Sequence, residues 1–401
     1  MKLPAQWSKV PLYQVANVQT GLSKSQNRTG PSVLRPYLRV ANVQDGYLDL
    51  TDIKEIEVPA SQVERFCLRN GDVLLTEGGD FDKLGRGSIW NGEIPGCVHQ
   101  NHVFAVRVVD RAVLLPEFLA CEIQSSRAKN YFLSCAKQTT NLASINSSQI
   151  KELPVLVPPL VEQRAIINAS AAWDTAIQKT EQLIAAKERY LAHVRDCLLR
   201  NPERASPTKL RDVTKELTAR NSTRHGRDAI MAITNTVGMR PMREETIAAG
   251  IERYKRVPPR AFAYNPMRLN IGSIAISPFD HEVLVSPDYV VFECDNSKLL
   301  PAYLYHLRYS QKWKSHFELA GNGSVRVRIY YDDLGRFALQ LPPVDVQARV
   351  ARALDAASDE ITLLKRSAAA LRAQKRGLMQ KLLTGQWRLP IPNQEEVAKY
   401  G

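Results

Sequence analysis

The chain has 401 residues, of which 44% are hydrophobic, and this is enough to fill the cores of two or three domains. Its 54 Lys and Arg residues outnumber 41 Asp and Glu residues, which gives a formal charge of +13 and a pI near 9.5. The composition excludes a disordered chain and favours a polyanionic partner, with nucleic acid ahead of an anionic membrane surface. No run approaches about 18 apolar residues and the N-terminus lacks a signal-peptide core, so we expect a soluble, cytoplasmic protein that contacts no membrane.

Residues 1–157 are predicted to form a first mixed α/β domain. Short β-like runs bounded by Gly, Asn and Asp come first, namely YLRVANV, GDVLLT, GSIW and HVFAVRVV, and a helical stretch, LPEFLACEIQSSRAKNYFLSCA, follows. Residues 205–341 contain the same parts in the same order. RAFAYNP, GSIAISP and YVVFEC stand where GDVLLT, GSIW and HVFAVRVV stood, and LPAYLYHLRYSQKWKSHFELA replaces the helical stretch. The middle of the two domains diverges, as expected for readers of different targets.

The segments that follow these domains also repeat each other. LPVLVPPLVEQRAI opens the first and LPPVDVQARV opens the second; Pro158 and Pro342 are 342 − 158 = 184 positions apart, and Gln163 and Gln347 keep that offset. This period is too long for a solenoid, whose repeats span about 20–50 residues. It indicates a duplicated unit of one domain plus one helix, which suits the reading of two similar targets a fixed distance apart.

Each Pro-Pro pair precedes a long predicted helix, at 160–200 and 344–384, because proline suits a helix start. Four heptads in each helix favour an antiparallel coiled coil over two helices packed separately on their own domains, with a length of roughly 60 Å at ~1.5 Å per residue. The seam positions are Trp173, Ile177, Thr180, Ile184, Lys187, Leu191, Val194 and Leu198 in the first helix, and Ala357, Ile361, Leu364, Ala368, Leu371, Lys375, Leu378 and Leu382 in the second. Lys187 and Lys375 interrupt the seam, and either fix its register or reach outward to solvent.

This layout resembles the DNA-specificity subunit of type I restriction–modification systems over nearly the whole chain. The resemblance is carried by the two helix openings, by the closing GLMQKLLTGQWRL, and in the first domain by GDVLLTEGGDFDKLGRGSIW, VHQNHVFAVRV and AKQTTNLASINSSQIKELPV. The second copy departs from the pattern at two places. GSVRVRIYYDDL replaces TTNLASINSSQI, and Asp345 lies one place before the equivalent of Glu162.

The resemblance implies an α+β fold, in which two similar target-recognition domains are separated by two long antiparallel coiled-coil helices with a pseudo-twofold internal repeat. The recognition domains are expected at 1–157 and 205–341, the helical spacers at 158–204 and 342–388, and a tail at 389–401. The resemblance also implies a non-catalytic subunit that binds double-stranded DNA, two adenine methyltransferase subunits and two restriction/translocase subunits. Each domain would read half of a bipartite, asymmetric site, with half-sites about one helical turn (roughly 34–36 Å) apart and the helices setting the gap.

No catalytic or cofactor motif is predicted. The chain lacks a Gly-rich phosphate loop, an Asp/Asn-Pro-Pro-aromatic methyltransferase motif, and any Cys-x-x-Cys pair among its six cysteines. Two segments could be mistaken for metal sites: Glu77–Lys83, which contains Asp80 and Asp82, and the pair His99 and His102. We interpret the first as a DNA-facing loop and the second as a polar cluster, and we expect no metal and no cofactor.

Candidate DNA contacts are polar and basic side chains, because Arg and Lys read guanine edges, Asn and Gln read adenine edges, and all of them contact phosphates. In the first domain they are Lys83, Arg86, Gln100, Asn101, His102, Lys137, Gln138, Thr139, Thr140, Asn141, Ser144 and Asn146. In the second they are Asn235, Arg240, Arg268, Asn270, Asn322, Ser324, Arg326 and Arg328. Glycines at 78, 79, 85 and 87 are expected to let the backbone approach phosphates, and Arg326 and Arg328 to point the same way along a strand. Turn capping for Gln100 and Asn101, and ordinary loop polarity for 137–146, are the alternatives.

Three other functions remain open. An enzyme that acts on DNA by itself would need a cofactor or metal motif. A coiled-coil scaffold that binds DNA through charge alone would show strong salt dependence without any sequence preference. A specificity subunit of a related defence system would work with different catalytic partners.

Overall fold

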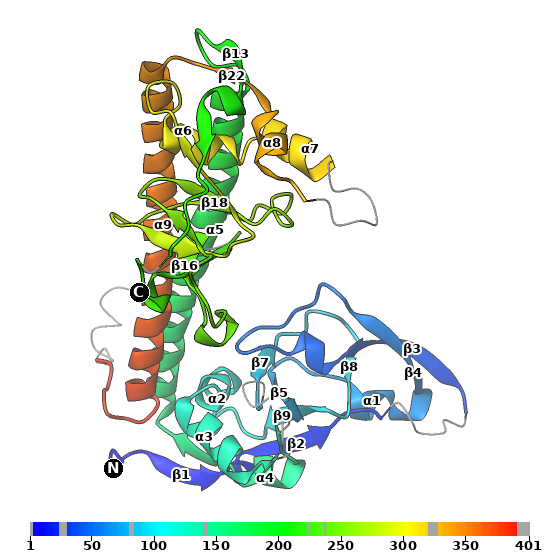
Figure 1. The fold of residues 1–401 in the computed structure, drawn as a ribbon. Helices are drawn as coiled ribbons and strands as arrows, with labels where there is room; N and C mark the ends of the chain where they lie inside the picture. The colour runs from blue at the N-terminus through cyan, green and yellow to red at the C-terminus, as the bar shows by residue number, and fades with distance from the viewer. Residues whose placement is uncertain are drawn as a thin grey trace, which may run out of the picture. The chain divides into compact units, whose positions relative to one another are not determined.

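The computed structural model describes residues 3–23, 30–79, 84–138, 143–222, 224–235, 238–319 and 328–390. The chain divides into two compact units, unit 1 with Met1–Lys179 and Ala368–Gly401, and unit 2 with Thr180–Ser367. Two long helices, α5 (Leu160–Arg200) and α9 (Val344–Leu382), each contribute one part to each unit, and Figure 1 labels the elements. Both helices form where the sequence predicts them. Within the described ranges, no helix is long and apolar enough to cross a membrane.

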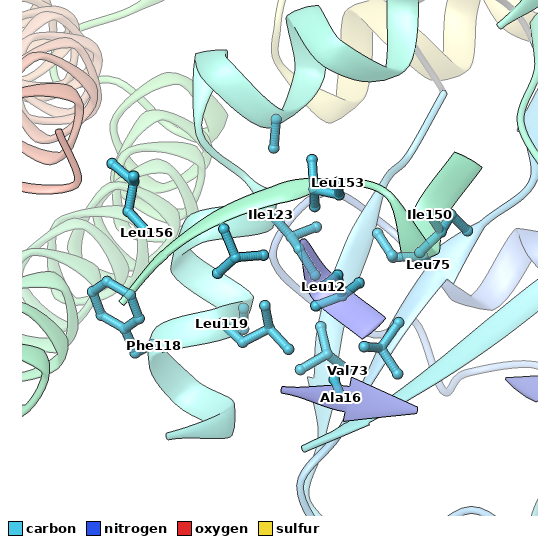
Figure 2. Packing of buried hydrophobic residues seen from close by; sticks show 14 of the residues in the cluster. Leu12, Ala16, Val73, Leu75, Phe118, Leu119, Ile123, Ile150, Leu153 and Leu156 are labelled. Atoms are coloured by element: carbon cyan, nitrogen blue, oxygen red, sulfur yellow. The ribbon is translucent and has the colours of Figure 1, made fainter. Parts of the chain in front are cut away.

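The core of unit 1 is an antiparallel four-stranded sheet. Its strands are β2 (Ala16–Thr20), β5 (Asp72–Thr76), β7 (Gly87–Trp90) and β9 (Val103–Val108), in the order β2-β9-β5-β7. Every residue of β5 is buried. Helix α2 (Pro116–Ile123), which begins on a proline, packs against β5 and β7. Figure 2 shows Leu119 and Ile123 of this helix close to Leu12 and Val73 in one apolar cluster.

Unit 2 builds the same sheet from the predicted equivalents. Its strands are β14 (Thr214–Glu216), β18 (Phe262–Tyr264), β19 (Ile274–Ile276) and β21 (Val290–Cys294), in the order β14-β21-β18-β19. Helices α6 (Pro301–Leu307), α7 (Gln311–Leu319) and α8 (Tyr331–Gly335) follow, as α2, α3 (Ser126–Cys135) and α4 (Ser147–Lys151) do in unit 1. The single helical stretch predicted in unit 1 is therefore two helices, because Ser125 caps a new one by accepting a hydrogen bond from Ala128 N at 3.2 Å.

The inserted parts of the two units differ, as the divergent sequences predict. Unit 1 inserts a three-stranded sheet of β3 (Ser32–Leu38), β4 (Lys54–Pro59) and β8 (Val98–His99), and the short helix α1 (Val63–Phe66). Unit 2 inserts two strand pairs, β15 (Met231–Thr234) with β16 (Gly238–Pro241) and β17 (Lys255–Val257) with β20 (Val283–Val285). Short 3-10 turns lie at Leu12–Gln14, Val40–Asn42, Ala60–Gln62, Leu210–Asp212, Arg227–Ala229 and Glu244–Thr246.

A two-stranded pair closes each unit beside a long helix. In unit 1, β1 (Ser8–Pro11) pairs with β12 (Pro154–Val157), and in unit 2, β13 (Ser206–Lys209) pairs with β22 (Ala338–Leu341). Both pairs are antiparallel, and β12 and β22 each run directly into a Pro-Pro pair and a long helix. The strand pair therefore holds the start of its helix against its own unit.

Gln163, at the start of α5, forms a buried link within unit 1. Its side-chain Oε1 accepts a hydrogen bond from Leu115 N at 2.8 Å. Its Nε2 donates to the carbonyl oxygens of Val113 at 2.9 Å and Pro158 at 2.8 Å. The Gln163 side chain is fully buried, so these bonds satisfy backbone groups that water cannot reach.

Gln347, at the start of α9, repeats this link within unit 2. Its Oε1 accepts from Leu300 N at 2.8 Å, and its Nε2 donates to Lys298 O at 2.7 Å and Pro342 O at 2.8 Å. Gln347 is also fully buried. The offset seen between the two glutamines in the sequence therefore corresponds to the same three hydrogen bonds in both units, which confirms the internal repeat.

Ion pairs show that α5 and α9 run antiparallel in each unit. In unit 2, Lys187 Nζ lies 2.7 Å from Glu360, and Arg204, just beyond α5, lies 2.5 Å from Asp345 near the start of α9. Higher numbers in one helix thus meet lower numbers in the other. In unit 1, Lys375 Nζ lies 2.6 Å from Asp174 in the same sense. Both seam lysines end on a carboxylate of the other helix.

Asp345, which lies one place before the equivalent of Glu162, still forms an ion pair with an arginine, as Glu162 does. In unit 1, Arg388 Nη2 lies 2.5 Å from Glu162 Oε1, and in unit 2, Arg204 Nη2 lies 2.5 Å from Asp345 Oδ2. The two arginines are 388 − 204 = 184 positions apart, whereas the acids are one position out of step. The side chain of Glu162 is 6% exposed and that of Asp345 is 59% exposed, so the unit 2 pair lies at the surface and contributes less to stability.

The predicted seam is wrong at one position. All the other predicted seam residues are buried or half-buried, but Leu198 is 37% exposed and Leu199, at 7%, is buried in its place. A straight helix has about 3.6 residues per turn and drifts by roughly 20° per heptad from a 3.5-residue repeat. By the last heptad of α5 the following residue therefore faces the core.

Candidate nucleic-acid interface

Three polar segments of unit 1 meet where β5 ends. Glu77 directly follows this strand, and its backbone N–H donates to His102 O at 2.9 Å. Its carbonyl oxygen accepts from Ile145 N at 2.8 Å, and its carboxylate contacts His102 Nδ1. The segments around residues 77, 102 and 145, which the sequence suggests separately, therefore lie together.

A small sheet joins two of these segments. It consists of β10 (Lys137–Gln138), β11 (Ala143–Ser144) and β6 (Gly78–Gly79), in the order β10-β11-β6. Ser144 is paired with both Gly78 and Lys137. We call the described candidates of this region the unit 1 loop cluster: Arg86, Gln100, Asn101, His102, Lys137, Ser144 and Asn146.

Two members of the unit 1 loop cluster are held by internal hydrogen bonds. Arg86 is half-buried, and its Nη1 donates to Gln44 Oε1 at 3.1 Å. Asn146 caps helix α4: its Oδ1 accepts from Gln149 N at 2.9 Å, and Gln149 Oε1 accepts from Asn146 N at 2.8 Å. This reciprocal capping box gives Asn146 a structural role, which sequence reasoning did not assign to it.

The other members differ in exposure. Lys137, Ser144 and His102 are exposed, and Gln100 and Asn101 are half-buried. Asn101 Nδ2 lies 3.4 Å from His102 Nε2. Candidates Lys83, Thr139, Thr140 and Asn141 lie outside the described residues, as do Asp80 and Asp82 and the side chain of Gln138.

Internal packing explains two glycines of this region. A Cβ on Gly78 would lie 2.3 Å from Ala143 O, too close for any other residue. Gly85 has φ +61°, and a Cβ there would lie 2.5 Å from the ring of Phe132. The close approach expected toward phosphates is therefore an approach to the protein's own backbone and core at these positions.

A groove of about 890 Å³ occupies the corresponding place in unit 2. It lies beside the loop between β18 and β19, the equivalent of the loop after β5. Its polar lining includes Arg240, Arg243, Asn265, Arg268 and Asn270. No Asp or Glu is among the lining residues in the described part of the chain, so the groove carries positive charge and amide groups suited to phosphates and base edges.

Long-range contacts assemble this groove. Ser273 Oγ donates to Ile233 O at 3.3 Å, which joins the β18–β19 loop to strand β15. A Cβ on Gly272 would lie 3.9 Å from Asn235 Cβ, so Asn235 also lies against this loop. Ile329 N donates to Pro266 O at 3.0 Å and brings the segment before α8 to the same place.

All described candidates of unit 2 therefore gather around one loop, and we call them the unit 2 loop cluster: Asn235, Arg240, Arg268, Asn270 and Arg328. The side chains of Arg240, Arg268 and Asn270 make no hydrogen bond or ion pair with any described residue. The cluster thus offers cationic and amide groups to a ligand.

The strand predicted around Arg328 is wrong at this residue. Arg328 lies in no strand, because its neighbour Ile329 bonds to the β18–β19 loop instead of a strand ladder. Arg328 Nη1 donates to Tyr330 Oη at 3.3 Å, and this bond raises the pKa of Arg328. Candidates Asn322, Ser324 and Arg326 lie outside the described residues.

An equivalent backbone hydrogen bond occurs in each of the two loop clusters. Ile145 N bonds to Glu77 O in unit 1, and Ile329 N bonds to Pro266 O in unit 2, with 329 − 145 = 184. Both acceptors follow the strand that is third in the sheet order, β5 or β18. The same frame therefore presents a different set of polar side chains in each unit.

A family model for the type I restriction modification DNA specificity domain matches residues 4–187 and again 259–373. The chain belongs to this family. The two matches end at nearly equivalent places of the repeat, because 373 − 184 = 189 lies close to 187. The predicted membership of the specificity family is confirmed.

One relative of this specificity-family chain matches nearly its whole length, and another matches about half of it. The type I restriction enzyme MjaX specificity subunit of Methanocaldococcus jannaschii is 21% identical over 434 residues, which cover 97% of this chain and 95% of that protein. The EcoKI specificity subunit of Escherichia coli is 30% identical over 191 residues, covering 46% of this chain and 38% of that protein.

Solved structures share the fold. A chain from a structure of the type I restriction–modification system aligns with a TM-score of 0.63 at 18% identity, covering 96% of this chain and 100% of that chain. The HsdS subunit of Thermoanaerobacter tengcongensis aligns with a TM-score of 0.52 at 18% identity, covering 96% and 99%. The predicted α+β fold with an internal repeat and two long helices is confirmed.

The two histidines beside the unit 1 loop cluster have different environments. His99 is 1% exposed and its Nδ1 lies 2.7 Å from Val103 O, whereas the His102 side chain is 52% exposed and contacts Glu77. Across the described ranges, no group of three His, Cys, Asp or Glu residues could hold a metal ion. His99 is therefore a buried structural residue of this specificity-family chain.

We expect His99 to make the stability of the protein depend on pH. Burial lowers the pKa of His99 to about 4, against about 6.5 when unfolded. Between these values the unfolded chain binds more protons, so stability falls as pH decreases from about 6.5 to 4, by roughly 3 kcal/mol in total. Denaturant titrations of the wild type and His99→Gln, each at pH 7 and pH 5, should show the larger acid loss in the wild type. An equal loss in both would contradict this assignment.

Sequence reasoning missed Arg243 and Asn265, which line the unit 2 groove. Asn265 directly follows β18, so its position in the repeat, equivalent to the residue after β5, was the available signal. Arg243 follows β16 in a segment without a counterpart in unit 1, and no pattern in the sequence distinguishes it from the many other arginines.

Proposed function

We propose that residues 1–157 and 205–341 are two target-recognition domains, each of which reads one half of a bipartite, asymmetric DNA site. The observation that carries this proposal is the shared frame of the two loop clusters, which presents different side chains in each unit. A repeated backbone arrangement that carries different polar side chains in its loops suits two domains that each recognise a different short DNA sequence. The +13 charge suits the DNA backbone on which both would sit.

The unit 2 loop cluster supports direct reading of bases. The guanidinium groups of Arg240 and Arg268, which have no partner among the described residues, suit guanine, and the amide of Asn270 suits adenine. In unit 1, the exposed Lys137 and Ser144 and the half-buried Gln100 offer a different set. Arg86 would act through Gln44, by positioning the loop, rather than by reading a base.

The helical spacers, 158–204 and 342–388, would set the unread gap between the half-sites. They would also dock two adenine methyltransferase subunits, and through these two restriction/translocase subunits. The chain itself would supply recognition, and its partners would supply methyl transfer and ATP-dependent cleavage. The antiparallel ion pairs between α5 and α9 support a spacer of fixed length.

A base-resolution map of methylated adenine tests this proposal. Cells that express the chain with its neighbouring methyltransferase subunit should show one bipartite motif, and deletion of this chain alone should abolish it. Exchange of residues 205–341 for those of another family member should change one half of the motif and leave the other half unchanged. A methylation pattern that ignores the chain, or a change in both halves, would contradict the proposal.

A further inference from the structure

A tryptophan fills the groove at the end of α9 in unit 1. Trp7 is 7% exposed, and its indole Nε1 donates to Glu162 Oε2 at 3.1 Å. Arg388 holds the same carboxylate, with Nη2 2.5 Å from Glu162 Oε1. The apolar walls include Ile166 and Leu382, and the space left is about 10 Å³, no more than one water molecule would occupy.

The corresponding groove in unit 2 is open. Its volume is about 540 Å³, and it lies between the end of α5 and the start of α9. Its walls include Leu198, the equivalent of Leu382, and Val350, the equivalent of Ile166. Leu382 is 1% exposed in the filled groove of unit 1, whereas Leu198 is 37% exposed in the open groove of unit 2.

The repeat shows why this groove is open. Ser8 pairs with Val157 in unit 1 and Ser206 pairs with Leu341 in unit 2, and 341 − 157 = 184. The two serines thus hold equivalent positions in their strand pairs. The residue before the serine is the filling tryptophan in unit 1 and Ala205 in unit 2. The second unit therefore has the groove without the side chain that fills it in unit 1.

We propose that the open groove receives an aromatic side chain, of the size and polarity of tryptophan, from a methyltransferase subunit docked on this chain. The filled groove of unit 1 shows what such a site accepts: an indole between aliphatic walls, with a carboxylate at the rim for its N–H. In unit 2, Glu203 lies at the rim and Arg349 Nη2 lies 3.5 Å from its Oε2, so a carboxylate is again present. Buried tryptophans of this kind are common anchors of protein interfaces.

This inference rests on the proposed function, because it takes the docked subunit as the source of the side chain. DNA is a poor occupant, since the rim carries the carboxylate of Glu203 and the walls are aliphatic. A free indole is too small to be held tightly without a chain attached, since binding costs its translational freedom. A partner segment already held by the helices avoids most of that cost.

Alkylation of Cys197 reports on the groove directly. Cys197 lines the groove and is exposed, whereas every other cysteine in the described ranges is buried or half-buried. We expect N-ethylmaleimide to modify Cys197 at least about tenfold more slowly in the complex with the methyltransferase subunit than in the chain alone. A high concentration of N-acetyl-L-tryptophanamide should also slow the reaction, and N-acetyl-L-alaninamide should not.

The variant Ala205→Trp should plug the groove from within. We expect it to slow Cys197 alkylation without any partner and to weaken binding of the methyltransferase subunit about tenfold, the loss typical of one anchor residue. Ala205→Ser is the matched control and should change neither. Protection of Cys197 in the wild-type complex needs no variant, so the test stands even where Ala205→Trp does not fold.

Two outcomes would overturn the inference. Unchanged Cys197 reactivity in an assembled complex would show that the subunit leaves the groove empty. Protection by N-acetyl-L-tryptophanamide without protection by the subunit would show that the groove accepts an indole from elsewhere. Failure of the proposed function is separate, because then no complex forms and no bipartite methylation motif depends on the chain.

Discussion

Replacement of Gln347 by leucine is expected to lower the free energy of unfolding of unit 2 by about 3–5 kcal/mol, among the largest effects of any single substitution. Leucine has nearly the same size but no polar atoms. It would leave Leu300 N–H and the carbonyl oxygens of Lys298 and Pro342 without the partners they have now. Each buried group left unpaired costs about 1–3 kcal/mol. Gln163→Leu should have a similar effect in unit 1.

Urea titration followed by circular dichroism and by tryptophan fluorescence would measure both losses. Gln340→Leu is the matched control, because Gln340 is an exposed residue of β22 whose side chain makes no hydrogen bond within the described chain. We expect the control to stay within roughly 0.5 kcal/mol of the wild type. A loss as small for Gln347→Leu would mean that water reaches these backbone groups, and that the glutamine pair has no structural role.

The repeat could be recognised in the sequence because the residues that show it have structural roles that few other residue types can fill. Gln163 and Gln347 each satisfy three backbone groups, and Pro158 and Pro342 shape the start of a long helix. Such residues keep their spacing when surface residues diverge. The bonds themselves could not be predicted, because they join Gln163 to Leu115, far away in the chain, and no local pattern encodes that contact.

For the loop clusters, the sequence indicated which polar and basic residues could bind DNA, but not which of them lie together. Side-chain chemistry suggested Arg240, Arg268 and Asn270, and the structure places all three in one groove. The loop that carries Arg268 and Asn270 is joined to β15, the partner strand of Arg240, through Ser273 and Ile233, a contact that the sequence does not reveal. The same chemistry also suggested Asn146, whose side chain caps a helix instead. A polar residue in a loop serves its own backbone or a ligand, and only the contacts distinguish these roles.

Replacement of Arg268 by alanine is expected to weaken binding to the target DNA about 10- to 100-fold, equivalent to roughly 1–3 kcal/mol. Its guanidinium group lines the unit 2 groove without a partner among the described residues, so removal costs the protein little stability. Arg253→Ala is the matched control. Arg253 is exposed in the same unit but does not line the groove, and its loss changes the net charge equally.

Fluorescence anisotropy of the assembled complex on labelled duplexes would separate the two ways in which Arg268 can contact DNA. If it reads a base, the alanine variant should lose discrimination at one position of one half-site and retain the salt dependence of the wild type. If it binds a phosphate, affinity should fall on all sequences and the slope of log K against log salt should decrease by about 1. An equal loss of affinity for Arg268→Ala and Arg253→Ala would mean that Arg268 contributes to binding only through long-range electrostatic attraction. The unit 2 groove would then not be the surface that contacts the target bases.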